Sequence, residues 1–287
     1  MDVSVIVPVY NGLPELQDQL EALSRQTFDG EWELLLVDNA STDGTFDAAQ
    51  EWVGRLPLRC LRATDRQGPS YARNVGARHA QGEWLAFCDA DDVADPAWLE
   101  RLYAAREGAD MVSGAMGVAE LNPPWTVLAR GPSAVWDELP EGPCDYLPFA
   151  RSCNVLVRRS AFEALDGFDE SLPFLEDVDL SWRGQLAGWT LAVAPTALIH
   201  YRYRPTPMGV YRQMANYEGA EVLLYQRFRS QGAQRRPAAV VARKVGWLVV
   251  RAPYPLLGPR RRYVWFTMLG GMVGRARGSV RYRTLYL

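Results

Sequence analysis

The segment VSVIVPVYNG, residues 3–12, is an apolar, largely β-branched run that ends in a turn signal. Such a run is typical of a strand that is buried on both faces, as in a parallel sheet. Leucines then recur at helical spacing within residues 13–27, which predicts a helix. A second apolar run at residues 33–37 completes a strand–helix–strand unit. This alternation predicts an α/β fold with a mostly parallel sheet flanked by helices.

The same alternation continues to about residue 200. Further strands are predicted at residues 58–61, 84–88, 111–118, 155–158 and 190–194, and further helices at residues 45–53, 71–79, 97–106, 160–165 and 176–187. Residues 119–145 are rich in Pro, Gly and Trp and are predicted to form a loop region. Helical segments rich in Arg, Trp and Tyr follow. We therefore predict an α/β domain at residues 1–205 and a helical, basic extension at residues 206–287.

The net charge of −3 conceals an asymmetry along the chain. Residues 1–200 carry 14 Arg and 32 acidic residues, whereas residues 201–287 carry 17 basic and two acidic residues. An acidic body is suited to hold metal ions, and a basic tail is suited to contact anionic lipid head groups or a phosphate-bearing acceptor. In the alternative interpretation, the tail forms salt bridges with the acidic body.

Two apolar stretches of the tail, residues 245–250 and 263–273, are shorter than the roughly 20 residues that span a bilayer as a helix. No transmembrane span is predicted. Arginines flank the second stretch, which fits a helix that lies in the membrane interface. The alternative is that these residues complete the core or a dimer contact, so homo-oligomer formation stays open.

The cysteines and the N-terminal residues indicate a cellular compartment. The four cysteines are scattered without a CxxC pair, which argues against a zinc site or a disulfide framework. No signal-peptide pattern precedes the first strand. We expect a cytoplasmic protein, with peripheral contact to the inner face of the membrane through the basic tail.

Acidic side chains follow two predicted strands. Asp38 comes after the second strand, and Asp89-Ala90-Asp91-Asp92 comes after the fourth. Ligands of open α/β sheets bind at the carboxyl ends of strands, so we expect these residues to share one cleft. Two carboxylates two residues apart can hold a divalent cation whose open positions take phosphate oxygens. Asp43, in an Asp-Gly pair, is more simply a turn residue.

Motifs in a fixed order along residues 1–205 resemble glycosyltransferase family 2. They are VSVIVPVYN at residues 3–11, VDNASTDGT at 37–45, ARNxG at 72–76, DADD at 89–92, GFDE at 167–170 and EDVDL at 176–180. The resemblance implies a Rossmann-like GT-A catalytic domain. It also implies a nucleotide-diphosphate sugar donor and inversion at the anomeric carbon.

The resemblance implies a donor site on one side of the cleft. Its expected residues are Pro8, Tyr10, Asp38, Arg66, Arg73, Asn74 and Asp89. Asp38 is expected to accept a hydrogen bond from the base, and Asp89 to reach the ribose or the surroundings of the metal. Two residues have simpler interpretations: Arg73 as an ion-pair partner of an acidic neighbour, and Asn74 as a partner of backbone groups.

The resemblance further implies a site for Mn²⁺ or Mg²⁺. Asp91 is expected to bind the cation directly, with His200 as a second ligand. A lone histidine is more often structural, and that alternative stays open for His200. A divalent ion stabilises the charge that builds on a departing nucleoside diphosphate. His79 has no such support and is expected on an exposed helix face.

Glu176 and Asp177 begin a predicted helix, where the helix dipole stabilises a carboxylate that can still accept a proton. The resemblance implies that Asp177 is the catalytic base and that Glu176 orients the acceptor or the base. Alternatively, one or both only cap the helix. Asp179, two residues on, is expected to be structural.

These residues predict a metal-dependent, inverting glycosyltransferase that acts on a lipid-linked or polysaccharide acceptor hydroxyl. A nucleotidyltransferase is less favoured, because no Gly-rich phosphate loop with Arg or Lys follows the first strand. A non-catalytic metal-binding or carbohydrate-binding module would bind the donor without turnover. Nucleic acid is not an expected partner, since only the basic tail points to it.

Overall fold

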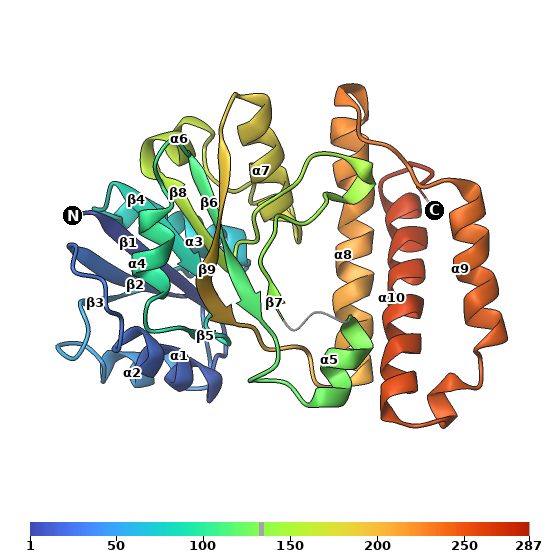
Figure 1. Cartoon of the computed structure of the whole chain (residues 1–287), viewed down its shortest axis with the longest axis horizontal. Coiled ribbons are helices and arrows are strands. Elements are labelled where there is room, and N and C mark those ends of the chain that lie inside the picture. Colours follow the sequence, from blue (N-terminus) through green and yellow to red (C-terminus); the bar gives the residue numbers. More distant parts are fainter. Residues whose placement is uncertain (132–134, 287) are drawn as a thin grey trace. The chain divides into compact units, whose positions relative to one another are not determined.

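The computed structural model describes residues 1–131 and 135–286, which form two units (Figure 1). The first unit comprises residues 1–117, 135–140 and 149–201, and the second comprises residues 118–131, 141–148 and 202–286. The division near residue 201 lies close to the domain boundary expected at residue 205. Two segments of the loop region expected at residues 119–145 group with the helical second unit.

A single sheet organises the first unit. Its strands are β1 (Val3–Val9), β2 (Trp32–Asp38), β3 (Leu58–Arg62), β4 (Trp84–Cys88), β5 (Val93–Ala94), β6 (Met111–Gly117), β7 (Val135–Trp136), β8 (Asn154–Arg158) and β9 (Leu191–His200). The strand order is β3-β2-β1-β4-β8-β6-β9-β5, and β7 pairs with β6. The helices of this unit are α1 (Glu15–Leu23), α2 (Thr45–Gln50), α3 (Pro69–His79), α4 (Trp98–Ala104), α6 (Arg159–Ala164) and α7 (Glu176–Leu186).

Most strands of the sheet point in one direction. β3, β2, β1 and β4 are parallel neighbours, and β6 and β9 form a second parallel pair. β8 lies antiparallel between β4 and β6, while β5 and β7 are short antiparallel additions at β9 and β6. The predicted α/β architecture is therefore confirmed. The parallel strands require crossover connections, which the helices provide.

The core lies on both faces of the sheet, because alternate residues of β1 point to opposite sides. Val5 and Val7 pack with apolar residues of α1, α2 and α4, whereas Ile6 packs with those of α3, α6 and α7. Gly76 lets α3 lie close to β1, since a Cβ at this position would be 2.5 Å from Ile6 Cγ2. This close packing brings the preceding turn of α3 to the carboxyl edge of the sheet.

Some predicted boundaries need correction. The helix predicted at residues 71–79 begins two residues earlier, at Pro69. The loop predicted for residues 119–145 contains α5 (Pro124–Arg130). Contacts distant in sequence stabilise α5: Trp125 packs edge-to-face on Tyr263 with ring centroids 5.7 Å apart. Such contacts have no signature in local sequence.

The second unit is a helical assembly of α5, α8 (Pro207–Phe228), α9 (Ala238–Val250) and α10 (Pro259–Arg281). α8 and α10 contact each other through a seam of small residues. A Cβ at Gly270, Gly274 or Gly278 would overlap backbone oxygens of α8. Beside the seam, buried Arg275 forms an ion pair with Glu218.

The apolar stretch at residues 263–273 lies within α10, where Tyr263 and Gly270 are buried. Gly271 is also buried, and the other residues of this stretch are partly buried. This burial favours the alternative in which the stretch completes the core of the second unit. Among the described helices, none combines the length and the apolar character needed to cross a membrane.

We expect Gly274→Ala to lower the free energy of unfolding by about 1–3 kcal/mol, because its methyl group would overlap the carbonyl oxygen of Ala215. Gly246→Ala, in α9, is the matched control, since no atom lies within 4 Å of a Cβ there. The control should be neutral or stabilising by up to about 1 kcal/mol. Denaturant unfolding followed by circular dichroism measures both; equal stability of the two variants would contradict the close helix contact.

Candidate active site

A buried arginine connects three elements at the carboxyl edge of the sheet. Arg73 of α3 donates from Nη2 to Asp89 Oδ1 at 2.6 Å and from Nη1 to Glu176 Oε1 at 2.7 Å. Its side chain is only 4% exposed. The ion-pair interpretation of Arg73 thus matches the structure. The same contact brings the carboxylate that follows β4 and the acid pair that begins α7 to one place.

The positive charge near Glu176 and Asp177, the acid pair at the start of α7, does not fully offset the cost of burying their carboxylates. Burial raises the pKa of Glu176 to about 7, with Arg73 opposing and the neighbouring Asp177 adding to the shift. Burial also raises the pKa of Asp177. Backbone N–H groups partly offset this second shift, since Ser152 donates to Oδ2 at 3.1 Å and Val178 donates to Oδ1 at 2.8 Å. The two donors fix the orientation of the Asp177 carboxylate.

The backbone immediately before this pair is strained. Leu175 has φ 62° and ψ 28°, a left-handed conformation that is rare for a bulky residue. Such conformations persist only where the surrounding structure imposes them, and they cluster at functional sites. The turn at Leu175 sets the direction in which Glu176 and Asp177 leave the start of α7.

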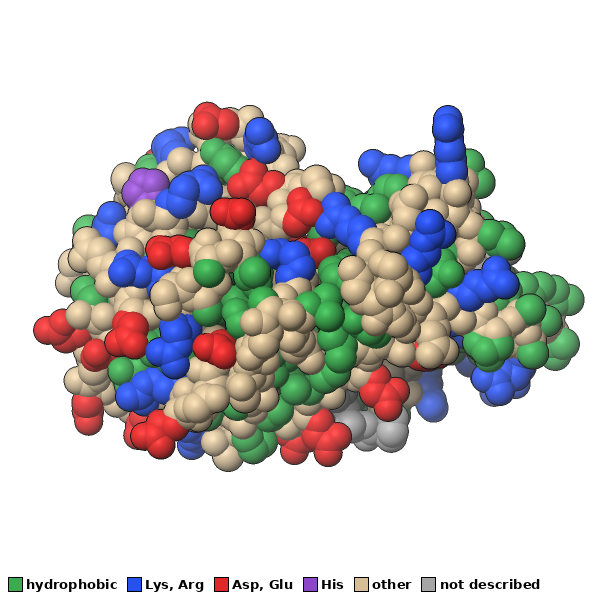
Figure 2. Space-filling model, turned by 90° about the horizontal axis from the view of Figure 1, so that it is seen from above, with side chains coloured by type: hydrophobic (Ala, Val, Ile, Leu, Met, Phe, Trp, Pro, Cys, Tyr) green, Lys and Arg blue, Asp and Glu red, His purple; other side chains and the backbone are tan. Residues whose placement is uncertain are grey.

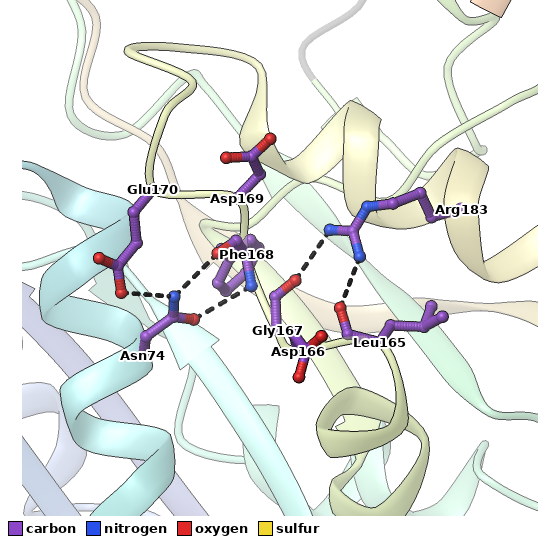
Figure 3. A pocket seen from close by; sticks show the side chains of 8 residues that line it. All are labelled: Asn74, Leu165, Asp166, Gly167, Phe168, Asp169, Glu170 and Arg183. Atoms are coloured by element: carbon purple, nitrogen blue, oxygen red, sulfur yellow. Dashed lines mark hydrogen bonds between the residues drawn. The ribbon is translucent and has the colours of Figure 1, made fainter. Parts of the chain in front are cut away.

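Asn74 holds the turn that contains the GFDE motif (Figure 3). Its Nδ2 donates to the Phe168 carbonyl at 2.8 Å and to Glu170 Oε1 at 3.1 Å, and its Oδ1 accepts from the Phe168 N–H at 3.0 Å. Both ends of the amide are therefore engaged, as in the simpler interpretation of this residue. A depression of about 430 Å³ lies beside this turn, lined on one side by Asn74 and on another by Arg183.

Asp179 has the structural role expected of it. It accepts from Arg183 Nε at 2.7 Å, and the same guanidinium donates to the carbonyls of Leu165 and Gly167, each at 2.8 Å. The two bonds from Arg183 to these carbonyls are drawn at the right of Figure 3. Asp179 and Arg183 thus hold the GFDE turn from the side opposite Asn74.

The nucleotide side of the expected site lies at the ends of β1 and β2. Asp38 is fully buried, with Oδ2 at 3.3 Å from the Ser41 N–H. Pro8 is partly buried and Tyr10 is 53% exposed. Arg66 extends into solvent, with its Nη1 at 3.2 Å from Glu170 Oε2. Asp43 accepts from the Thr45 N–H at 3.0 Å, in keeping with its interpretation as a turn residue.

Sequence analysis missed two buried amides that fix the loops of this edge. Asn39 donates to the carbonyls of Ala63 and Arg66 at 2.6 and 2.7 Å and accepts from the Gly68 N–H at 2.7 Å. Gln19 donates to the Asp89 carbonyl at 3.0 Å and accepts from the Ala94 N–H at 2.9 Å. The available signal for Gln19 was a polar residue beside the apolar positions of α1.

An acidic cluster beside the DADD motif could hold a divalent cation. Asp89, Asp92 and Cys153 each offer a ligand atom within 4.8 Å of the others. Burial raises the pKa of the Cys153 thiol well above its ordinary value, and a neutral thiol is a weak ligand for Mn²⁺ or Mg²⁺. The carboxylates suit such a cation.

The two expected metal ligands lie on paired segments. Asp91 and His200 are both partly buried. The strand pairing sets His200 opposite Val93, two residues after Asp91. A carboxylate and an imidazole are acceptable ligands for Mn²⁺, so the side chains present fit the expected cofactor. His79, in contrast, is exposed on α3.

A mostly parallel α/β sheet with carboxylates at the carboxyl ends of its strands is the arrangement expected of the GT-A fold. The family model described as Glycosyl transferase family 2 matches residues 4–166. This chain belongs to glycosyltransferase family 2.

Curated relatives share about a third of the aligned residues. Glycosyltransferase AglE of Haloferax volcanii is 32% identical over 207 residues, which cover 71% of this chain and 67% of the relative. The pre-mycofactocin glycosyltransferase of Mycobacterium tuberculosis is 30% identical over 217 residues, covering 71% of this chain and 43% of the relative. The chain thus spans about two thirds of the first relative and less than half of the second.

Solved structures show the same fold. The mannosyltransferase PcManGT from Pyrobaculum calidifontis, in complex with GDP-Man and Mn²⁺, matches with a TM-score of 0.65 at 21% identity, covering 96% of this chain and 85% of that one. TarS from S. aureus, in complex with UDP-GlcNAc, matches with a TM-score of 0.60 at 19% identity, covering 100% and 93%. At these identities the likeness concerns the fold alone.

We expect Glu176→Gln to flatten the dependence of stability on pH between about 4.5 and 7. The pKa of Glu176 rises from 4.5 to about 7 in the folded protein, so the folded state binds more protons in this interval and stability falls as pH increases. The fall is on the order of 1–3 kcal/mol. Urea unfolding across this range measures it, with Glu163→Gln on the exposed face of α6 as the control. Parallel pH profiles for wild type and Glu176→Gln would refute the assignment.

Proposed function

We propose that this glycosyltransferase is a metal-dependent, inverting enzyme that moves a sugar from a nucleoside diphosphate to an acceptor hydroxyl. The observation that carries the proposal is the double ion pair of Arg73. Through one guanidinium, Asp89 of the DADD motif lies near Glu176, the neighbour of Asp177. This contact supports a single site for the donor and the proton acceptor, as a single displacement requires.

Asp177 is the proposed catalytic base. Asp177 is partly buried and its carboxylate is held by two backbone donors, whereas Glu176 is buried and occupied by Arg73. A raised pKa makes a carboxylate a stronger proton acceptor. As the acceptor oxygen bonds to the anomeric carbon, Asp177 takes its proton. The bond from that carbon to the diphosphate oxygen breaks on the opposite face, and its electron pair leaves with the diphosphate.

Glu176 and Arg73 have a supporting role in this proposal. Arg73 orients Asp89 and Glu176, and its positive charge opposes the repulsion between the carboxylates of Glu176 and Asp177. The donor would lie along Pro8, Tyr10 and Asp38. Arg66 and Asn74 would contribute from the edge of the cleft, Asn74 chiefly by fixing the GFDE turn.

Asp91 and His200 are the proposed ligands of the divalent cation, Mn²⁺ or Mg²⁺. When bound, the cation would offset the negative charge on the departing diphosphate. Support comes from the acidic cluster at Asp89 and Asp92, and from the fold shared with PcManGT, whose structure contains GDP-Man and Mn²⁺. The nucleotide sugars in the two solved neighbours define the first donors to test.

The acceptor we propose is a lipid-linked or polysaccharide glycan, and the proposed place of action is the cytoplasmic face of the cell membrane. The basic tail supports both, because it carries 17 of the chain's 31 basic residues. Free thiols at all four cysteines agree with a reducing compartment.

Asp177→Asn should lower kcat about 100- to 10,000-fold while leaving donor affinity nearly unchanged, because an amide cannot take the acceptor proton. The measurement is the release of UDP or GDP from a panel of nucleotide sugars, with lipid-linked and glycan acceptors present. Asp29→Asn, at an exposed position before β2, makes the same chemical change outside the cleft and should be fully active. Normal turnover by Asp177→Asn would mean that the base is another residue.

Asp91→Ala and His200→Ala should each weaken the effect of Mn²⁺ on nucleotide binding by at least about tenfold. Calorimetric titration with UDP and with GDP, in the presence and absence of Mn²⁺, measures this independently of turnover. Asp29→Asn again serves as the control and should keep the full effect of the metal. If Asp91→Ala retains it too, the metal-ligand assignment fails.

A further inference from the structure

An exposed apolar face runs along α9 and the turn that follows it. Val249 and Val250 are 69% and 75% exposed, and Leu256 in the turn is 84% exposed. Val245 and Leu257 extend the same surface, at 45% and 50% exposure. No described residue of α9 is buried. At the right edge of Figure 2, which corresponds to α9 of Figure 1, hydrophobic side chains protrude between basic ones.

We propose that this face, defined by Val245, Val249, Val250, Leu256 and Leu257, docks on a bilayer that contains anionic lipids. The proposal deepens the membrane location suggested above by naming the surface, and it rests on the second unit rather than on the chemistry of sugar transfer. It also assigns the membrane contact to α9 rather than to residues 263–273 of α10, which are buried or partly buried.

The apolar residues lie on one side of α9. Val245 and Val249 are four residues apart, and Ala242, Gly246 and Val250 occupy the adjoining exposed positions. A helix of 13 residues is about 20 Å long, less than the roughly 30 Å of the hydrocarbon core. A helix with one apolar face and this length is suited to lie in the plane of the interface.

Aromatic and basic side chains border the apolar face. Trp247 packs edge-to-face on Tyr254, with ring centroids 5.7 Å apart. Arg251 lies over both rings and donates from Nε to the Tyr254 hydroxyl at 3.1 Å, while Arg261 lies over Tyr254 from α10. Trp and Tyr favour the boundary between lipid tails and head groups, and Arg can reach the phosphates there.

The basic sequence around this apolar face favours an anionic bilayer as its binding partner. Residues 222–287 contain 14 Lys and Arg and no Asp or Glu. A second copy joined through the same face would bring these cations together, and like charges oppose such contact. An anionic bilayer offers both an apolar interior and complementary charge, with about 1 kcal/mol gained for each basic residue near its surface.

Flotation of the full-length protein with vesicles tests the proposal. Wild type should float with vesicles of phosphatidylcholine and phosphatidylglycerol and not with phosphatidylcholine alone. Val250→Glu and Leu256→Glu should each reduce the partition coefficient about tenfold or more, because each would place a carboxylate in the interface. Val53→Glu is the matched control: Val53 is 55% exposed in the first unit, and this variant should float like wild type.

The basic residues are tested in the same assay. Arg243→Gln and Arg260→Gln, both at exposed positions, should each lower the partition coefficient about fivefold, which corresponds to the loss of about 1 kcal/mol. The binding that each variant retains should still be lost at high salt, because salt screens the attraction between the basic side chains and the anionic lipids. Circular dichroism of each variant establishes that the fold is intact.

Three results would overturn the proposal. The first is equal flotation of Val250→Glu and wild type, and the second is equal binding of wild type to neutral and anionic vesicles. The third is a wild-type dimer that does not float and that Val250→Glu converts to a monomer, which would identify a second copy as the occupant. All three are measured without a nucleotide sugar, so failure here is distinct from failure of the proposed reaction.

Discussion

The double ion pair of the buried Arg73 guanidinium is the interaction on which the geometry of the candidate active site depends. Arg73 lies on α3, which Gly76 allows to approach β1, and it binds one carboxylate after β4 and another at the start of α7. Without it, the acids would be buried together with little compensating charge, which proteins rarely tolerate. The raised pKa values of Glu176 and Asp177 indicate how incomplete that compensation already is.

Buried amides provide the second level of order at this edge of the sheet. Asn39, Asn74 and Gln19 each bind backbone groups of a loop through both ends of the side chain. Loops leave backbone donors and acceptors without regular partners, and these side chains supply them. Side chains on rigid helices and strand ends thus position the irregular segments between them, an arrangement suited to a preorganised site.

Hydrophobic patterning was sufficient to predict the longer strands of the sheet, since buried strands appear as continuous apolar runs, whereas the two-residue strands β5 and β7 are too short to give such a signal. The ordered motifs assigned Asp38 and the DADD segment to the ends of two parallel strands, and in the structure these are β2 and β4, which lie on either side of β1. The roles of Asn39 and Gln19 depend on contacts across 24 to 75 positions of sequence, which periodicity does not reveal. A distant contact also explains α5, which is stabilised by Tyr263. For α10 the sequence pattern was ambiguous, because its apolar residues fit an interface helix and a packed helix equally well.

The glycine seam between α8 and α10 restricts how the second unit can change. Gly270, Gly274 and Gly278 approach the backbone at Tyr211, Ala215 and Gly219, so each contact repeats every four residues on both helices. At these points no side chain exists that can rearrange to admit a larger neighbour. Amino-acid variation along α10 is therefore most constrained at every fourth position, and a shift in the register of one helix would have to move all three contacts together.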